Sequence, residues 1–373
     1  MNDVAARAPR TVILDDHFPT LSSGFRLAEF TELMRAGLVD EVLTTMGPFD
    51  EVLAPFAERY PELAHRVRPY SPDLMSGYDQ AYIVFLNNAN YYLEALEDAR
   101  LPFVLTLFPG GGLDGSEECR SKLRRVLGSP LLRHVLTTQP RVSELVSSEF
   151  PDVPQTLLSG LFASPGYFVP GAGTRENYYG SSKETLDLCF VAHKYSTTGA
   201  DKGFPVFVET INELRRHGLP ARGHIVGEFT AEDVEAVGDA THIATYGVLD
   251  SDQLRQFYGG MDAIVSPNVP GVLSTGAFDG FPLASCVEGA LCGVAMIVSD
   301  ELHQNRFLRD GRDALIVSPT SKAVVDRIER VLLERDGIRR IARSGLRVVR
   351  YVYSPGRQLD LRAPVLARVA ESV

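Results

Sequence analysis

The sequence predicts an α/β protein of two doubly wound, Rossmann-like domains that face a central cleft. The chain has 373 residues, which at roughly 100–200 residues per domain suggests two domains. Short apolar runs alternate with amphipathic helical segments through both halves, as expected for parallel sheets covered by helices. One aperiodic stretch rich in Gly, Ser, Pro and Tyr, residues 163–183, interrupts this alternation and predicts a linker or hinge.

The first half is predicted to form a domain over residues 1–170. Its β-branched, apolar run at 11–19 predicts a buried strand. An amphipathic helix is predicted over residues 25–37, with Gly37 closing it. Further strands are predicted at 40–47, 80–88, 102–108 and 133–139, with helical stretches between them.

The second half is predicted to form a domain over residues 171–353 with the same alternation. Its predicted strands are 185–193, 222–227, 242–247, 262–267, 294–300 and 313–319. Its predicted helices are 203–218, 251–261, 285–293, 321–337 and 338–352. Ligands of doubly wound sheets bind beyond the carboxyl ends of the strands, so functional residues are expected in the loops that follow these strands.

The composition excludes several classes of protein. A formal net charge of −11 argues against nucleic-acid binding, which needs a basic surface. The four cysteines are scattered without a C-x-x-C pair, so we expect neither a disulfide scaffold nor a zinc site. No apolar run reaches the roughly 18 residues of a membrane span, and the first residues lack the apolar core of a signal peptide. These features predict a cytoplasmic protein.

A basic stretch at residues 119–134 stands out in this acidic chain. Its cations are Arg120, Lys122, Arg124, Arg125 and Arg133. Such a stretch is typical of a solvated helix face, and it also suits weak contact with a membrane surface or with a phosphate of an acceptor.

The densest functional signal is the segment DGFPLASCVEGALCG, residues 279–293. Asp279 and Glu288 flank a tight loop containing Gly280 and Pro282, and the loop leads directly into a helix. A helix N-terminus offers free N–H groups and the positive end of a dipole, which suits a pyrophosphate. The two carboxylates suit hydroxyls of a ribose and a sugar; alternatively, Asp279 is a turn residue and Glu288 a solvated helix carboxylate.

This segment resembles the donor loop of retaining family-4 glycosyltransferases of the GT-B fold. In that family two acidic residues surround a Gly-Phe-Gly or Gly-Phe-Pro loop, and a helix ending in Ala-x-x-x-Gly follows. The later segment NRFLRDGRDALIVSP also resembles the family pattern E-x-x-x-x-G-x-x-G-x-L-V. The chain departs from the pattern in having Asp279 as the first acid and eight residues between the pair instead of seven. The resemblance implies that Glu288 binds the donor ribose and that Asp279 contacts the sugar.

The same resemblance implies further donor-binding residues. It assigns Gly280, Phe281, Pro282 and Leu283 to the donor loop. In the segment FVAHKYSTTGADKGF, Lys202 directly precedes a glycine, as does the family lysine that neutralises the departing pyrophosphate, and Lys194 lies near the position of a family arginine. Gly227 ends a strand where the family packs a turn against the donor. Ordinary surface lysines in a loop are the alternative for Lys194 and Lys202.

The first half carries a weaker resemblance. Gly24 lies between the first strand and helix, where the family keeps a glycine-rich loop near the transferred sugar. Gly110–Gly112 follow another predicted strand. The family has a histidine at the end of that strand, whereas this chain has Phe108. In the second half, the segment YGVLDSDQL resembles a family pattern that lies close to the nucleotide base. Tyr246 and Val248 are expected to pack in the core, and the alternative is that one of them lines the base pocket.

The activity that the resemblance implies is glycosyl transfer from a nucleotide diphosphate sugar to an acceptor hydroxyl, with retention of configuration. Lys202, Asp279 and Glu288 are the expected catalytic residues. No metal and no cofactor are expected besides the co-substrate, and the acceptor is a carbohydrate, a lipid-linked compound or a small molecule. The first domain would then serve the acceptor, the second the donor, and residues 354–373 would form a helix crossing back to the first. A nucleotide-sugar epimerase and a non-catalytic nucleotide-sugar-binding protein of the same fold are the alternatives.

Overall fold

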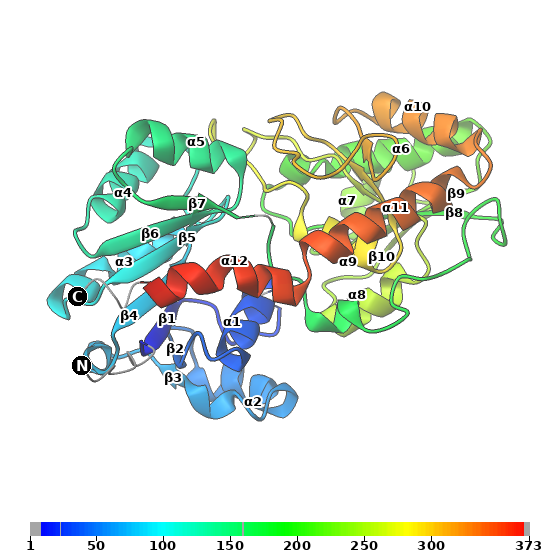
Figure 1. Ribbon diagram of the computed structural model, residues 1–373. Helices are drawn as coiled ribbons and strands as arrows, with labels where there is room; N and C mark the ends of the chain where they lie inside the picture. The colour runs from blue at the N-terminus through cyan, green and yellow to red at the C-terminus, as the bar shows by residue number, and fades with distance from the viewer. Residues whose placement is uncertain (1–8, 23, 159, 369–373) are drawn as a thin grey trace. The chain divides into compact units, whose positions relative to one another are not determined.

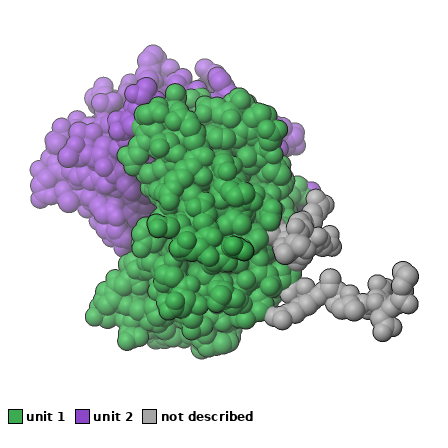
Figure 2. Space-filling view, turned by 90° about the vertical axis from the view of Figure 1, so that its left-hand side faces the viewer, with its two compact units in different colours: residues 1–162, 355–373 green, residues 163–354 purple. Residues whose placement is uncertain are grey.

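The computed structural model describes residues 9–22, 24–158 and 160–368, and the chain divides into two compact units (Figure 1). Unit 1 takes in residues 1–162 and 355–373, and unit 2 takes in residues 163–354 (Figure 2). Each unit is built around its own parallel sheet and its own hydrophobic core.

Unit 1 contains a seven-stranded sheet in the order β3-β2-β1-β4-β5-β6-β7, and every pair of neighbours is parallel. The strands are β1 (Thr11–Asp15), β2 (Glu41–Thr44), β3 (Val67–Pro69), β4 (Gln80–Val84), β5 (Phe103–Leu107), β6 (Leu132–Thr137) and β7 (Gln155–Leu157). The α-helices are α1 (Phe25–Arg35), α2 (Phe49–Arg59), α3 (Leu86–Asp98), α4 (Glu117–Leu127), α5 (Pro140–Glu149) and α12 (Pro355–Arg368). Strands β1, β4 and β5 are buried along their whole length, as continuous apolar runs in a covered parallel sheet must be.

The last helix, α12, belongs to unit 1 because buried polar contacts attach it there. The Arg362 guanidinium lies 2.9 Å from a carboxylate oxygen of Glu29 on α1, and both side chains are fully buried. Gln80 of β4 donates a hydrogen bond of 2.7 Å to the carbonyl of Leu366. A buried charge is tolerated only when it is paired, so this ion pair anchors the end of the chain.

Unit 2 contains a six-stranded parallel sheet in the order β10-β9-β8-β11-β12-β13. The strands are β8 (Leu186–Val191), β9 (Ala221–Val226), β10 (Ile243–Thr245), β11 (Ala263–Ser266), β12 (Ala295–Val298) and β13 (Leu315–Ile316). The α-helices are α6 (Phe204–Arg216), α7 (Ala231–Glu235), α8 (Ser251–Tyr258), α9 (Ala284–Leu291), α10 (Ser321–Leu332) and α11 (Gly337–Val352). The predicted α/β architecture of two doubly wound sheets is confirmed.

Both sheets reverse their strand order at one position, between β1 and β4 in unit 1 and between β8 and β11 in unit 2. In a doubly wound sheet the loops at such a switch point diverge to opposite faces and leave a crevice for a ligand. In unit 2 the loops after β8 and β11 are those that contain Lys202 and Asp279. The topology therefore explains how residues from separate parts of the sequence come together.

The stretch 163–183, predicted as a linker or hinge, begins at the boundary between the two units and is itself packed in unit 2. Tyr167 and Tyr178 are buried in unit 2, and the Tyr178 hydroxyl donates a 2.7 Å hydrogen bond to the carbonyl of Gly293. The Arg175 guanidinium donates to the backbone carbonyls of Gly259 and Met261. Two buried tyrosines and one arginine therefore hold this aperiodic stretch against the rest of unit 2.

None of the helices in the described ranges combines the length and the apolar character that crossing a membrane requires.

Candidate functional site

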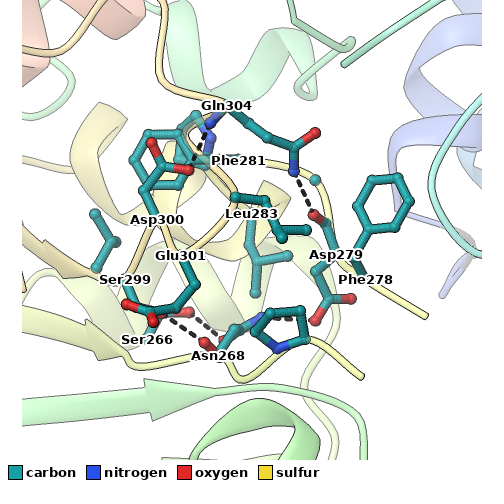
Figure 3. A pocket seen from close by; sticks show the side chains of 15 residues that line it. Ser266, Asn268, Phe278, Asp279, Phe281, Leu283, Ser299, Asp300, Glu301 and Gln304 are labelled. Carbon is teal, nitrogen blue, oxygen red and sulfur yellow. Dashed lines mark hydrogen bonds between the residues drawn. The ribbon is translucent and has the colours of Figure 1, made fainter. Parts of the chain in front are cut away.

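The loops after β11 and β12 line a hollow at the carboxyl end of the unit 2 sheet (Figure 3). Its walls include the predicted donor-loop residues Asp279, Gly280, Phe281, Pro282 and Leu283. The facing wall comes from the segment that follows β12, residues 299–304. The structure thus collects the whole predicted loop around one concavity.

Lys202, which does not itself line the hollow, forms an ion pair with Asp279, which does. The ammonium nitrogen of Lys202 lies 2.5 Å and 2.7 Å from the two carboxylate oxygens of Asp279, although 77 positions separate the residues in the chain. Lys202 is only 6% exposed, and its charge is also 3.7 Å from Asp201. A lysine is rarely buried without a carboxylate partner, so this pairing accounts for its position. The alternative, an ordinary surface lysine, therefore does not fit Lys202, and its predicted role at the donor pyrophosphate stays a prediction.

A glycine places Lys202 in this position. Gly203 has a φ of +75°, in the left-handed region, and a side chain there would put its Cβ 2.1 Å from the carbonyl oxygen of Pro267. Only glycine permits both the dihedral angle and the close approach. The loop after β8 is thereby pressed against the loop after β11, which brings Lys202 to Asp279.

Asn268 is a site residue that the sequence did not reveal. Its amide donates a 2.7 Å hydrogen bond to Asp279, and its amide oxygen accepts one of 3.0 Å from Ser266 (Figure 3). The Ser299 hydroxyl donates to the backbone carbonyl of Asn268. These contacts orient the Asp279 carboxylate, and no motif marked Asn268 because its role arises from the fold of the loop after β11.

Gln304 contributes a second unpredicted contact. Its amide nitrogen donates a 3.2 Å hydrogen bond to the backbone carbonyl of Asp279 (Figure 3). Its amide oxygen is buried and accepts no hydrogen bond within the described part of the chain. Gln304 therefore ties the segment after β12 to the predicted donor loop and keeps an acceptor atom unused at the hollow.

Glu288 lies on α9 as a half-buried carboxylate. Burial raises its pKa to about 7. Across residues 9–22, 24–158 and 160–368, nothing donates a hydrogen bond to this carboxylate or pairs with it. The nearby Tyr167 and Tyr258 have raised pKa values, chiefly through burial and then through the charge of Glu288. Both phenols donate to backbone carbonyls, those of Ser251 and Ser285, so the accepting capacity of Glu288 is unused.

The N-terminus of α9 follows the predicted donor loop directly. Leu283 occupies the N-cap position, and no side chain caps the helix there. The first N–H groups of a helix have no partner within the helix, and together with the helix dipole they attract anions. An anion at this terminus would lie beside the Gly280–Leu283 loop, as the sequence predicts for a pyrophosphate.

Lys194 and Gly227 lie in neighbouring loops but do not line the hollow. Lys194 forms a 2.7 Å ion pair with Asp233 of α7. Gly227 ends β9 with a φ of +134°, and a Cβ there would fall 1.9 Å from the carbonyl oxygen of Ala192. Gly227 therefore permits a close approach between the loops after β8 and β9.

Gly24, Phe108 and Gly110–Gly112 belong to unit 1. Gly24 precedes α1 with a φ of +57°. Phe108, at the end of β5, is buried, and its ring centre lies 4.4 Å from that of Phe25 and 5.8 Å from that of Phe85. The residue that replaces the family histidine is thus part of an aromatic cluster.

The expectation that Tyr246 and Val248 pack in the core is wrong. Tyr246 is 45% exposed and Val248 51% exposed. The Tyr246 hydroxyl lies 2.9 Å from Nδ1 of His224, so a surface hydrogen bond and not core packing holds the ring. Both residues follow the edge strand β10, where no further strand covers them.

Residues 186–334 match the family model described as "Glycosyl transferases group 1", which takes in the hollow, Lys202 and Glu288. No curated protein is significantly similar to the chain in sequence.

Solved structures resemble the chain along nearly its whole length. Anabaena HepE, in complex with UDP and glucose, superposes with a TM-score of 0.70 at 12% identity, covering 96% of this chain and 99% of HepE. Sucrose-phosphate synthase from Thermosynechococcus elongatus gives a TM-score of 0.67 at 14% identity, covering 97% and 100%. A glycosyltransferase from Rickettsia africae gives 0.62 at 13% identity, covering 98% and 99%. The chain therefore has the GT-B fold, and its residues 186–334 are similar to the group 1 glycosyltransferases.

Proposed function

We propose that the protein transfers a glycosyl group from a nucleotide diphosphate sugar to an acceptor hydroxyl, with retention of configuration. Unit 2 holds the donor. The observation that carries the proposal is the buried Lys202–Asp279 pair, set against the Gly280–Leu283 loop at the uncapped N-terminus of α9.

This arrangement meets the main electrostatic requirement of the reaction. When the glycosyl bond breaks, negative charge develops on the departing nucleotide diphosphate. A fixed cation and N–H groups that point at this charge stabilise it without reorganisation. Lys202 is such a cation, and the helix terminus supplies the N–H groups. Because these groups supply the positive potential, we propose that the transfer needs no metal ion and no cofactor besides the donor.

The carboxylates of Glu288 and Asp279 bind the other two parts of the donor, the ribose and the sugar. Glu288 accepts hydrogen bonds from the ribose hydroxyls, since its carboxylate is half-buried and has no protein partner in the described structure. Asp279, oriented by Asn268 and Lys202, accepts from hydroxyls of the sugar. A neighbour of the same fold, Anabaena HepE, has been crystallised with UDP-glucose, which supports a donor of this class.

The remaining predicted residues have supporting roles. Lys194 adds positive potential near the diphosphate, Gly227 keeps the adjoining loops close, and Gly24 lies by the transferred sugar. The acceptor is a carbohydrate, a lipid-linked compound or a small molecule bound by unit 1. The four cysteines are free thiols, which supports function in the reducing cytoplasm.

The test begins with a thermal-shift screen against UDP, GDP, TDP and ADP, which identifies the nucleotide. The matching nucleotide sugars are then incubated with the purified protein and candidate acceptors, with and without EDTA. Acceptor-dependent release of nucleotide, unaffected by EDTA, supports the proposal, and NMR of the product reports the anomeric configuration. Isomerisation of the donor sugar would instead indicate an epimerase, and binding without turnover would indicate a non-catalytic protein.

A further inference from the structure

A second concave surface of unit 2 is rich in arginine. The loop at residues 306–312 and the C-terminal half of α11 enclose a shallow hollow of about 460 Å³. Its polar lining consists of Arg306, Arg309, Arg312, Ser344, Arg347 and Tyr351. None of these residues lines the hollow at Asp279, so the two concavities are distinct.

The base of this arginine hollow is preorganised by a buried acid. Asp313 is fully buried and accepts hydrogen bonds from the Arg309 guanidinium at 2.8 Å and from the Ser344 hydroxyl at 2.6 Å. Arg347 donates to the Ser344 hydroxyl at 3.4 Å. Burial opposes ionisation of Asp313, but the hydrogen bonds from Arg309 and Ser344 outweigh it and lower the pKa of this carboxyl. Arg309 is therefore held directly by this fixed carboxylate, and Arg347 contacts only the serine that donates to it.

The positive charge of the hollow exceeds what that carboxylate neutralises. Arg312 and Arg347 are exposed, and neither forms an ion pair within the ranges that the structure describes. The other acid of the loop, Asp310, is paired with Arg327 at 2.6 Å. Arg309 is thus paired with Asp313, whereas Arg312 and Arg347 bring positive charge to the hollow without an acidic partner in the described ranges, in a chain whose formal net charge is −11.

The remaining arginines of α11 differ in this respect. Arg339 and Arg343 both pair with Glu176, and Arg340 pairs with Glu334 at 2.5 Å. Arg350 donates to the backbone carbonyl of Ala172. These four arginines of α11 therefore each have an acidic or carbonyl partner. Arg347, which lines the hollow, has no acidic partner in the described structure.

We infer that this hollow is an anion-binding site for a phosphate group, carried either by a soluble phosphorylated compound or by a lipid headgroup. Guanidinium groups bind phosphate oxygens through paired, charge-assisted hydrogen bonds, and several around one concavity favour a dianion. The site is independent of the proposed donor hollow and of the glycosyl transfer.

Calorimetric titration with inorganic phosphate tests the site. The variant removes the two unpaired charges, Arg312→Gln with Arg347→Gln, and the control removes two arginines that pair with Glu176, Arg339→Gln with Arg343→Gln. We expect the first pair of substitutions to weaken phosphate binding at least tenfold and the control to change it less than twofold. Circular dichroism and melting temperature establish that both variants fold.

A third variant separates this site from the donor hollow. Lys202→Ala should leave phosphate affinity at the arginine hollow unchanged. If Lys202→Ala abolishes phosphate binding and the Arg312/Arg347 variant does not, the only anion site is the donor hollow and the inference is wrong. The same conclusion follows if the parent protein binds no phosphate and no anionic vesicle.

Vesicle sedimentation distinguishes the two sources of the phosphate. Phosphatidylcholine vesicles with and without phosphatidic acid are mixed with the parent protein and with both arginine variants. Sedimentation that requires phosphatidic acid and is lost in the Arg312/Arg347 variant assigns a lipid headgroup. Phosphate binding without such sedimentation assigns a soluble phosphorylated ligand, and equal sedimentation of both arginine variants would refute a lipid role for this hollow.

Discussion

Replacing Glu288 with glutamine should stabilise the protein and weaken nucleotide binding at the same time. Burial raises the pKa of Glu288 to about 7, from its ordinary value of 4.5. Between about pH 4.5 and pH 7, the carboxyl of Glu288 is therefore mostly protonated in the folded state and mostly ionised in the unfolded chain. By linkage, Glu288 makes folding progressively less favourable as the pH rises from 4.5 through 7.

The size of the effect follows from the same two values. At 1.36 kcal/mol per pKa unit, ionising Glu288 in the fold costs roughly 3 kcal/mol above pH 7. The side chain is half-buried and solvent relaxes around it, so we expect about 1–2 kcal/mol to be recovered by Glu288→Gln at pH 8. For a unit of this size, that corresponds to a rise in melting temperature of roughly 3–6 °C. At pH 5 the carboxyl is largely protonated, and the two proteins should melt together.

Nucleotide binding should change in the opposite direction. In the proposed role, the Glu288 carboxylate accepts hydrogen bonds from both ribose hydroxyls, whereas an amide offers only one acceptor oxygen. The lost charge-assisted contact, about 1.5–3 kcal/mol, raises the dissociation constant about tenfold or more at pH 8. In the parent protein, affinity should fall as the pH drops below 7, because Glu288 becomes protonated.

Two measurements check this reasoning. Differential scanning calorimetry at pH 5 and pH 8 reports the stability difference, and isothermal titration with the nucleoside diphosphate found in the screen reports affinity. Glu288→Asp is the control, since it keeps the charge and moves the carboxylate by one methylene. Equal melting temperatures at pH 8 would refute the burial argument, and equal affinities would refute the assignment of Glu288 to the ribose.

Three further changes test other contacts. Lys202→Ala should weaken nucleoside diphosphate binding by about 1.5–3 kcal/mol and lower kcat, because the cation facing the diphosphate is lost; unchanged titration and rate would remove Lys202 from the site. Asn268→Ala should lower kcat with the sugar donor while leaving nucleoside diphosphate affinity within twofold, since Asn268 acts through Asp279; an equal loss of both would mean that it contacts the nucleotide. Glu29→Gln should destabilise unit 1 by about 3–5 kcal/mol in a urea titration, because the charge of Arg362 is left buried without its partner; a shift below 1 kcal/mol would contradict the anchoring role of that pair.

Most strands were predictable because buried parallel strands have a strong apolar signature. The runs at 80–88 and 102–108 became β4 and β5, which are buried throughout. The strands β3 and β7 were not predicted. Each has three residues and lies at an edge of the sheet, where half of the backbone faces no partner strand and an apolar run is not required.

Composition misled where long-range contacts dominate. The stretch 163–183 has the Gly, Ser and Pro content of a linker, but Tyr167 and Tyr178 bury large rings in unit 2. For Tyr246 the error was the reverse: burial was expected, and the ring is exposed. Tyr246 follows β10, which lies at the edge of the sheet. Local sequence cannot distinguish these cases, since burial depends on what the rest of the chain places beside the ring.

The sequence by itself determined the α/β class, the residue types of the donor loop and the glycine that follows Lys202, because periodicity and loop chemistry are local properties of the chain. Only the tertiary structure decided that Lys202 meets Asp279, that Asn268 orients this carboxylate, and that Glu288 has no partner in the described structure. The physical reason is the strand order: β8 and β11 are neighbours at the switch point of the unit 2 sheet, so loops that are remote in sequence meet beyond their carboxyl ends.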